Sequence, residues 1–311
     1  MTELPRTEPP PTKPPPTKPP PTEPAADLGL FGPGSVTWRV HAEPILAVAG
    51  LRALFLQALH PRALAGVTQN SSFRTDPWGR LVRTVTFVAT AIYGSTTQAE
   101  AAGRRVRQVH AQLTAVDPAT GERFRVDEPE LLRWVHVTEV DSYADTARRA
   151  GLRLRPAEWD RYWHEQRRTA ALVGLDPDTV PGSAAEAASY FRAVRPELAM
   201  TREAARALMF LATPPPPWPP GTGWRRSLLD RLGRPPFRLA HLGVAATAFG
   251  LLPGWARRLY GMPVLPTADL TATLSARGLR LALNSLPHRL YEGPLYRSAM
   301  ARAAAATVGT R

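Results

Sequence analysis

The chain has 311 residues, of which 44% are hydrophobic, and it carries a formal net charge of +13. It contains no cysteine, which excludes disulfides, cysteine-ligated zinc or iron sites, a thiolate-ligated haem and a cysteine nucleophile. Its two lysines, Lys13 and Lys18, lie in a proline-rich N-terminal stretch, so Schiff-base chemistry is not expected in the rest of the chain. An arginine excess of this size fits nucleic acid, an anionic membrane surface or an anionic cofactor or substrate, and equally the codon usage of a GC-rich genome.

The first 27 residues differ from the remainder in composition. Pro9–Pro24 is a five-residue repeat of PPPT followed by Lys or Glu, which cannot form a core and is typical of an extended polyproline II segment. Residues 1–27 are therefore predicted to be a disordered tail, and residues 28–311 to form one domain. The tail lacks the apolar segment of a signal peptide, so a cytoplasmic protein is expected.

Helical periodicity dominates the body of the chain. Proline in the first helical turn, as in "DEPELL" at Asp127–Leu132, and a helix cap in "STTQAE" at Ser95–Glu100 mark two helix starts. The predicted helices are Pro44–His60, Leu81–Tyr93, Ala99–Val116, Glu128–Ala150, Pro156–Leu172, Ala184–Arg195, Thr201–Ala212, Ser227–Leu232, Arg238–Leu252 and Leu270–Leu286.

One short strand is predicted at Glu122–Val126, after the turn Asp117–Gly121. The fold class is therefore all-α. The proline-rich stretch Thr213–Gly223 is interpreted as a long loop, and His60, before Pro61, as a cap of the preceding helix.

The apolar stretch Leu239–Ala256 is too interrupted to span a membrane. Arginines flank it on both sides, which is compatible with a buried core helix and also with peripheral contact to anionic lipid. No zinc finger, RNP-type aromatic string or recognition-helix unit is found, so nucleic-acid binding is not predicted.

Seven histidines are available as metal ligands, but HExxH is absent. His136 and Glu139 have the spacing of a di-iron motif in reverse order and without a second copy. His136, Asp141 and Ser142 are close in sequence, but no nucleophile elbow surrounds the serine, which favours a structural network over a hydrolase.

The stretch "PWGRLVRTVTFVATAIYG" (Pro77–Gly94) holds Arg80, Arg83 and Thr84 at helical spacing, followed by apolar residues. A buried guanidinium needs an anionic partner, and haem propionates are suitable. A haem requires little else than one imidazole and an apolar pocket. Arg80 pairing with Asp76, and Arg83 and Thr84 on a solvated face, are the alternatives.

Three blocks, Gln57–Gly94, Val109–Asp117 and Glu130–Arg149, closely resemble the family that contains MpaB and the rubber oxygenase called latex clearing protein. The resemblance extends over 38–258. It implies a globin-like helical core that holds b-type haem.

Specific residues carry this resemblance. Arg80, Arg83 and Thr84 in "RLVRT" match an Arg-x-x-Lys-Thr element near the haem, and His110 in "RQVHAQL" matches the histidine that binds iron. The resemblance implies His110 as metal ligand, Arg80 and Arg83 as cofactor-binding residues, and Thr84 and Arg83 as catalytic residues. His110 is otherwise read as a hydrogen-bonded histidine between helices.

Two departures from the family pattern are visible. Arg83 stands where the family has a lysine, and arginine does not readily deprotonate to ligate iron. No acid lies between Glu43 and Asp76 to match the catalytic glutamate of the rubber oxygenase. The expected function is a haem b-dependent oxygenase acting with dioxygen on an apolar, isoprenoid or other alkene substrate. A non-catalytic haem- or lipid-binding protein and a haem-free helical scaffold are the alternatives.

Overall fold

The computed structural model describes residues 27–71, 74–217, 224–263, 265–287 and 292–308. The predicted disordered tail, 1–27, falls outside this part of the chain except for Asp27. The described residues form thirteen α-helices, two 3-10 turns and one two-stranded hairpin, which confirms the all-α class. The helices are α1 Val36–His41, α2 Leu46–Gln57, α3 Pro61–Asn70, α4 Pro77–Tyr93, α5 Thr96–His110, α6 Pro129–Arg149, α7 Pro156–Leu172, α8 Ala184–Val194, α9 Arg202–Ala212, α10 Trp224–Gly250, α11 Gly254–Leu259, α12 Pro266–Asn284 and α13 Pro294–Val308.

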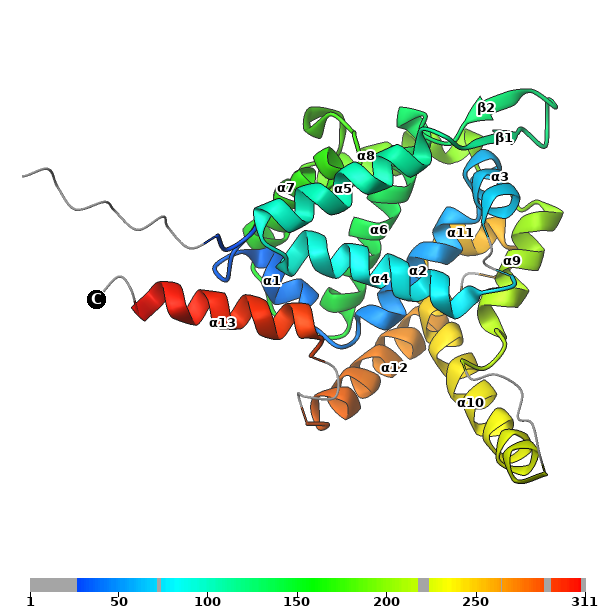
Figure 1. Ribbon diagram of the computed structural model, residues 1–311. Coiled ribbons are helices and arrows are strands. Elements are labelled where there is room, and N and C mark those ends of the chain that lie inside the picture. The colour runs from blue at the N-terminus through cyan, green and yellow to red at the C-terminus, as the bar shows by residue number, and fades with distance from the viewer. Residues whose placement is uncertain (1–26, 72–73, 218–223, 264, 288–291, 309–311) are drawn as a thin grey trace, which may run out of the picture.

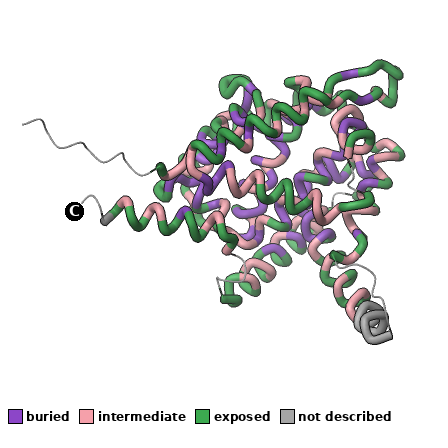
Figure 2. Tube along the Cα trace, viewed as in Figure 1, coloured by how far each residue is buried: buried purple, intermediate pink, exposed green. Residues whose placement is uncertain are grey.

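Helices α2 and α6 form the centre of the molecule (Figure 1). Phe55 and Leu56 of α2 and Trp134 and Val137 of α6 are almost wholly buried in one large apolar cluster, which Leu251, directly after α10, joins. Figure 2 shows this buried interior in purple, whereas α12 and the coloured part of α10 contain many exposed residues. Burial of this cluster is the main source of stability.

The two start signals read from the sequence, a cap in Ser95–Glu100 and a proline in the first turn of the helix after Asp127, are confirmed. Ser95 caps α5 and forms a capping box with Gln98, and Pro129 opens α6. The end of α5 was predicted six residues too late, because Thr114–Val116 is the strand β1. It pairs antiparallel with the strand β2, Arg123–Arg125, inside the predicted strand segment.

Several elements differ from prediction. Helices α1, α3, α11 and α13 were not predicted, and α1 and α11 have six residues each, which is too short for a clear period. Helix α10 is continuous through Pro235 and Pro236, where two helices were predicted. Both prolines are exposed, so backbone carbonyls that lose a partner there face solvent.

His60 was predicted to cap the preceding helix. Instead it is the N-cap of the following helix, α3, where its Nδ1 accepts a hydrogen bond from the backbone of Ala63 at 3.4 Å. Its φ and ψ are extended, as an N-cap requires. The ring thus satisfies one of the free N–H groups at the start of α3.

Helices α3 to α7, together with His41 of α1 and Gln57 of α2, enclose a cavity. Helix α5 lies close to α7 because Gly103 has no side chain, and a Cβ there would stand 2.6 Å from the carbonyl oxygen of Leu172. Helix α4 begins at Asp76, whose carboxylate accepts from the backbone of Gly79. In the described part of the chain, no helix combines the length and apolar character needed to cross a bilayer.

Candidate functional site

A cavity of about 280 Å³ lies among α1 and α3 to α7. We call it the α6 cavity, because α6 lines it along much of its length. Its lining includes both apolar side chains and several polar ones. Most α6 residues that line the cavity recur every three or four positions, so they lie on one side of the helix. They include Leu132, Val135, His136, Glu139, Val140 and Tyr143.

Helix α4 provides the wall opposite α6. Phe87, Val88, Ala91 and Ile92 line the α6 cavity, as the apolar residues after "RLVRT" suggested. Together with Val135 and Val140 they make its middle hydrophobic. Such a space favours an apolar ligand.

His110 lies at one end, which we call the arginine end. It is the last residue of α5, and its buried Nδ1 atom has no hydrogen-bond partner. Burial lowers the pKa of His110, and the nearby carboxylate of Asp127 partly opposes this effect. A buried ring nitrogen without a partner costs free energy, and a ligand placed there would remove the cost.

Two guanidinium groups line the same end of the cavity. Arg80 donates a hydrogen bond to the hydroxyl of Ser71, and burial lowers its pKa. Arg62 binds Glu128 at 2.7 Å and stacks on Phe124. The alternative considered from the sequence, an ion pair of Arg80 with Asp76, is not found among the described residues. Arg80 therefore retains a positive charge that no carboxylate among the described residues neutralises.

The structure does not bring Arg83 and Thr84 to the α6 cavity. Arg83 is 63% exposed and pairs with Asp76 at 3.3 Å, while the Thr84 hydroxyl donates to the carbonyl of Arg80 at 3.1 Å. Both belong to the exposed stretch 81–86 of α4. Of the four predicted site residues, His110 and Arg80 line the cavity, whereas Arg83 and Thr84 do not.

The other end of the cavity, which we call the acid end, contains Glu139. Burial raises the pKa of Glu139 to about 7, although a hydrogen bond from Tyr143 opposes the shift. The Tyr143 ring contacts His41 edge to face, and His41 lies 3.2 Å from the hydroxyl of Tyr162. A carboxyl group with this pKa exchanges protons near neutral pH.

His136 stands one turn before Glu139 on the same face of α6. Burial lowers the pKa of His136 to about 4, so its ring is neutral. In the sequence this pair has the spacing of a di-iron motif in reverse order, and the family pattern places a catalytic acid before Arg80 instead. The sequence signal for the acid end was this pair of polar residues on the apolar side of a predicted helix.

The part of the chain that forms this cavity matches a known protein family. Residues 38–284 match the model of a family described as "ER-bound oxygenase mpaB/B'/Rubber oxygenase, catalytic domain". The chain belongs to this family. No curated protein and no solved structure matches the chain. Every residue that lines the α6 cavity lies within the matched segment.

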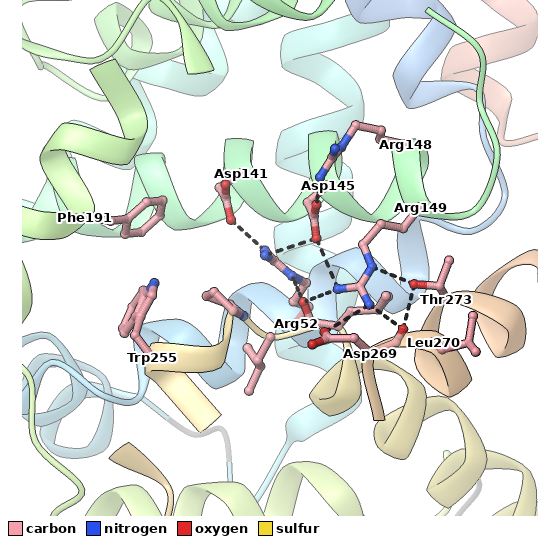
Figure 3. Close-up of a pocket in the computed structure, with 13 residues that line it drawn as sticks. Arg52, Asp141, Asp145, Arg148, Arg149, Phe191, Trp255, Asp269, Leu270 and Thr273 are labelled. Carbon is pink, nitrogen blue, oxygen red and sulfur yellow. Dashed lines mark hydrogen bonds and ion pairs between the residues drawn. The ribbon is translucent and has the colours of Figure 1, made fainter. Parts of the chain in front are cut away.

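This mpaB/rubber oxygenase family member has a second hollow of about 530 Å³, on the other side of α6 (Figure 3). Its central residue is Arg52, which is 2% exposed and donates to Asp141 and to Ser142, both at 2.8 Å. Arg149 donates to Thr273 at 3.0 Å. Its charged groups pair with one another in a network that joins α2, α6 and α12.

The network of the second hollow also includes two of the three residues, His136, Asp141 and Ser142, that the sequence assigned to a structural network in preference to a hydrolytic triad. Asp141 and Ser142 bond to Arg52 there, while His136 lines the α6 cavity. A hydrolytic triad is therefore not assembled. Among the described residues, no group of three or more histidines and acids is arranged to hold a metal ion.

Proposed function

We propose that the protein is a haem b-dependent oxygenase that uses dioxygen to oxidise an apolar substrate with a carbon–carbon double bond. The family is one of oxygenases, and this gives the reaction class. The observation that supports the haem is the His110 imidazole, whose buried Nδ1 has no partner and which lines a cavity with a hydrophobic middle.

The residues present fit a haem. A b-type haem needs one protein nitrogen for its iron, apolar contacts for the ring and positive charge for two propionates. His110 would supply the nitrogen, Arg80 and Arg62 the charge, and Phe87 and Val88 apolar contact. A haem iron needs one protein ligand, so a cluster of several ligands is not required.

The roles of the protein groups follow from their positions. Arg80 would bind a propionate, because it is the cavity guanidinium without a carboxylate partner. The apolar wall of α4 would orient the substrate and exclude water. When bound, haem would supply the activation of dioxygen. The cavity is just below the usual volume of a small-molecule site, so the surrounding helices must separate to admit haem and substrate together.

The decisive experiment compares haem content after expression with added haem precursor. The wild-type protein is expected to carry haem, measured as the pyridine haemochrome and the Soret band. His110→Ala should lose at least about tenfold in haem affinity, since it lacks the only proposed ligand. Oxygen consumption with a polyprenyl alkene then separates an oxygenase from a non-catalytic haem-binding protein.

Two other histidines provide the controls. His164→Ala changes an exposed histidine of α7 outside the α6 cavity and should keep full haem content. His136→Ala tests the other unpaired imidazole in the cavity. Full haem content in His110→Ala, or loss of haem in His136→Ala alone, would contradict the assignment of His110.

We also propose that the surface of α10 and α12 contacts anionic membranes. Leu239 and Leu242 of α10 and Leu270, Leu274 and Leu281 of α12 are exposed, with Leu239 74% exposed. The segment from Trp224 to Arg311 has thirteen arginines and three acids. Apolar residues beside an excess of positive charge are typical of surfaces that bind anionic lipid.

A further inference from the structure

The acid end of the α6 cavity has hydrogen-bonding capacity that the protein does not use. Tyr143 is the one hydrogen-bond partner of Glu139 among the described residues. A carboxyl group offers two oxygens and several acceptor sites, so most of its capacity remains open. The ring of His136, one turn away, has no hydrogen bond to any described residue.

The neighbouring polar groups are already paired. The ring of His41 bonds to Tyr162, the Gln166 amide donates to the Thr37 hydroxyl at 3.1 Å, and the Thr169 hydroxyl lies 3.1 Å from the Gln166 oxygen. Glu139 and His136 are thus the groups at this end that can still bind a ligand.

A pure hydrocarbon is a poor match for this arrangement. It would contact Phe87, Ile92 and Val140, but it would also strip water from Glu139 and His136 and give them no partner. Leaving buried polar groups unpaired is costly, and sites of this kind discriminate strongly against ligands that lack the polar group.

The acid end is also separated from the arginine end. His110 lies near Asp127, which precedes α6, whereas Glu139 is ten residues into that helix from Pro129. Ten residues of α-helix rise about 15 Å. A ligand held at Glu139 can therefore extend an apolar chain along α6 toward His110.

We propose that the substrate is an amphipathic molecule, an apolar chain that ends in a hydroxyl group, and that Glu139 with His136 beside it binds the hydroxyl. This rests on the proposed function in that both place the ligand in the α6 cavity. A hydroxyl donates and accepts, so it pairs with a carboxyl group in either protonation state. That property suits Glu139, because burial raises its pKa to about 7 and both states are present at neutral pH.

The test uses a matched pair of probes, the prenyl alcohol farnesol and the hydrocarbon farnesene, whose affinities for the purified protein are measured by displacement of an apolar fluorophore. Wild type should bind farnesol about ten- to a hundredfold more tightly. Glu139→Leu should bind farnesol and farnesene with similar affinity, because both probes then contact an apolar side chain at this position. Glu139→Gln should keep most of the preference, since an amide also donates and accepts.

Farnesene bound as tightly as farnesol by wild type, failure of both probes to bind, or an unchanged preference in Glu139→Leu would each overturn the proposal. Circular dichroism checks the folding of each variant, and Glu139→Met replaces the leucine variant if it does not fold. Haem content is measured separately on the same samples. Loss of haem with the farnesol preference intact rejects the proposed function alone, and normal haem without the preference rejects this inference alone.

Discussion

At the scale of single residues, the buried carboxyl of Glu139 is the least expected feature of the site. Buried acids are kept neutral by the protein interior, and an acid with a pKa near 7 costs stability whenever it ionises. The titratable groups that line the cavity around it are His41, His136, Tyr143, His110, Arg62 and Arg80. Both histidines nearest to it in the fold, His41 and His136, have pKa values lowered by burial and are neutral.

Glu139→Gln is expected to stabilise the protein at alkaline pH. The folded-state pKa of Glu139, about 7, lies above the ordinary value of 4.5, so the folded protein binds the proton more tightly than the unfolded chain. Wild-type stability therefore falls as pH rises from about 4.5 to 7, and the variant escapes this loss. Its advantage should grow to at most about 3 kcal/mol at pH 8, measured by urea unfolding at pH 5 and 8.

Glu158→Gln is the matched control for this experiment. The backbone N–H of Arg155 and the guanidinium of Arg39 lower the pKa of Glu158 to about 2. The stability that the ionised Glu158 carboxylate contributes is thus lost only as pH falls from about 4.5 toward 2. The free energy of unfolding of this variant should therefore differ from that of wild type by a constant amount between pH 5 and 8. A constant difference for Glu139→Gln as well would contradict a raised pKa at Glu139.

At the scale of elements, the position of His110 depends on how closely α5 approaches α7. Gly103 makes that contact possible, since its missing Cβ leaves room for the Leu172 carbonyl. The guanidinium of Arg107 also donates to this carbonyl, at 2.5 Å. The contact fixes α5, and with it the imidazole that faces the cavity.

Gly103→Ala is expected to destabilise the protein by about 1–3 kcal/mol and to reduce haem content, because the new methyl group meets backbone atoms and displaces α5. Thermal unfolding and the Soret band measure the two effects. Gly278→Ala in α12 is the control: no atom lies within 4 Å of its Cβ position, so alanine should stabilise the helix by about 0.5–1 kcal/mol. Equal effects of the two substitutions would show that α5 and α7 are not held by this contact.

At the scale of the whole molecule, charge and exposed apolar surface are concentrated in the C-terminal part. Helices α10 and α12 lie at the side of the molecule opposite the β1–β2 hairpin (Figure 1). Leu239 and Leu281 are 74% and 69% exposed. An interaction of this surface with anionic lipid is expected to weaken with salt, since exposed charges are screened.

The protein is expected to sediment with vesicles of phosphatidylglycerol and not with those of phosphatidylcholine. Leu239→Gln combined with Leu281→Gln should weaken this binding by about tenfold, because less apolar surface enters the bilayer interface. Val116→Gln, on the hairpin, removes a similar exposed apolar residue elsewhere and should have no effect. Equal binding to neutral vesicles, or no effect of the leucine substitutions, would exclude this surface as the lipid contact.

Sequence patterns alone predict the all-α class, the caps that begin α5 and α6, the short strand before α6 and the family. Each of these is local or a pattern along the chain: a helix cap at Ser95, a proline at the first turn of α6, and a 3.6-residue period. It also identified His110 and Arg80 as candidates, and both line the cavity.

Which polar residues share one cavity follows from the packing of the helices and not from the sequence pattern. Arg80, Arg83 and Thr84 have helical spacing, yet Arg83 pairs with Asp76 and Thr84 is exposed, because burial depends on the helices that cover α4 and not on α4 itself. Glu139 joins His110 in one cavity although 29 residues separate them in the sequence, since α5 and α6 border the same space. Periodicity specifies the face of a helix, whereas the packing of other helices decides what that face meets.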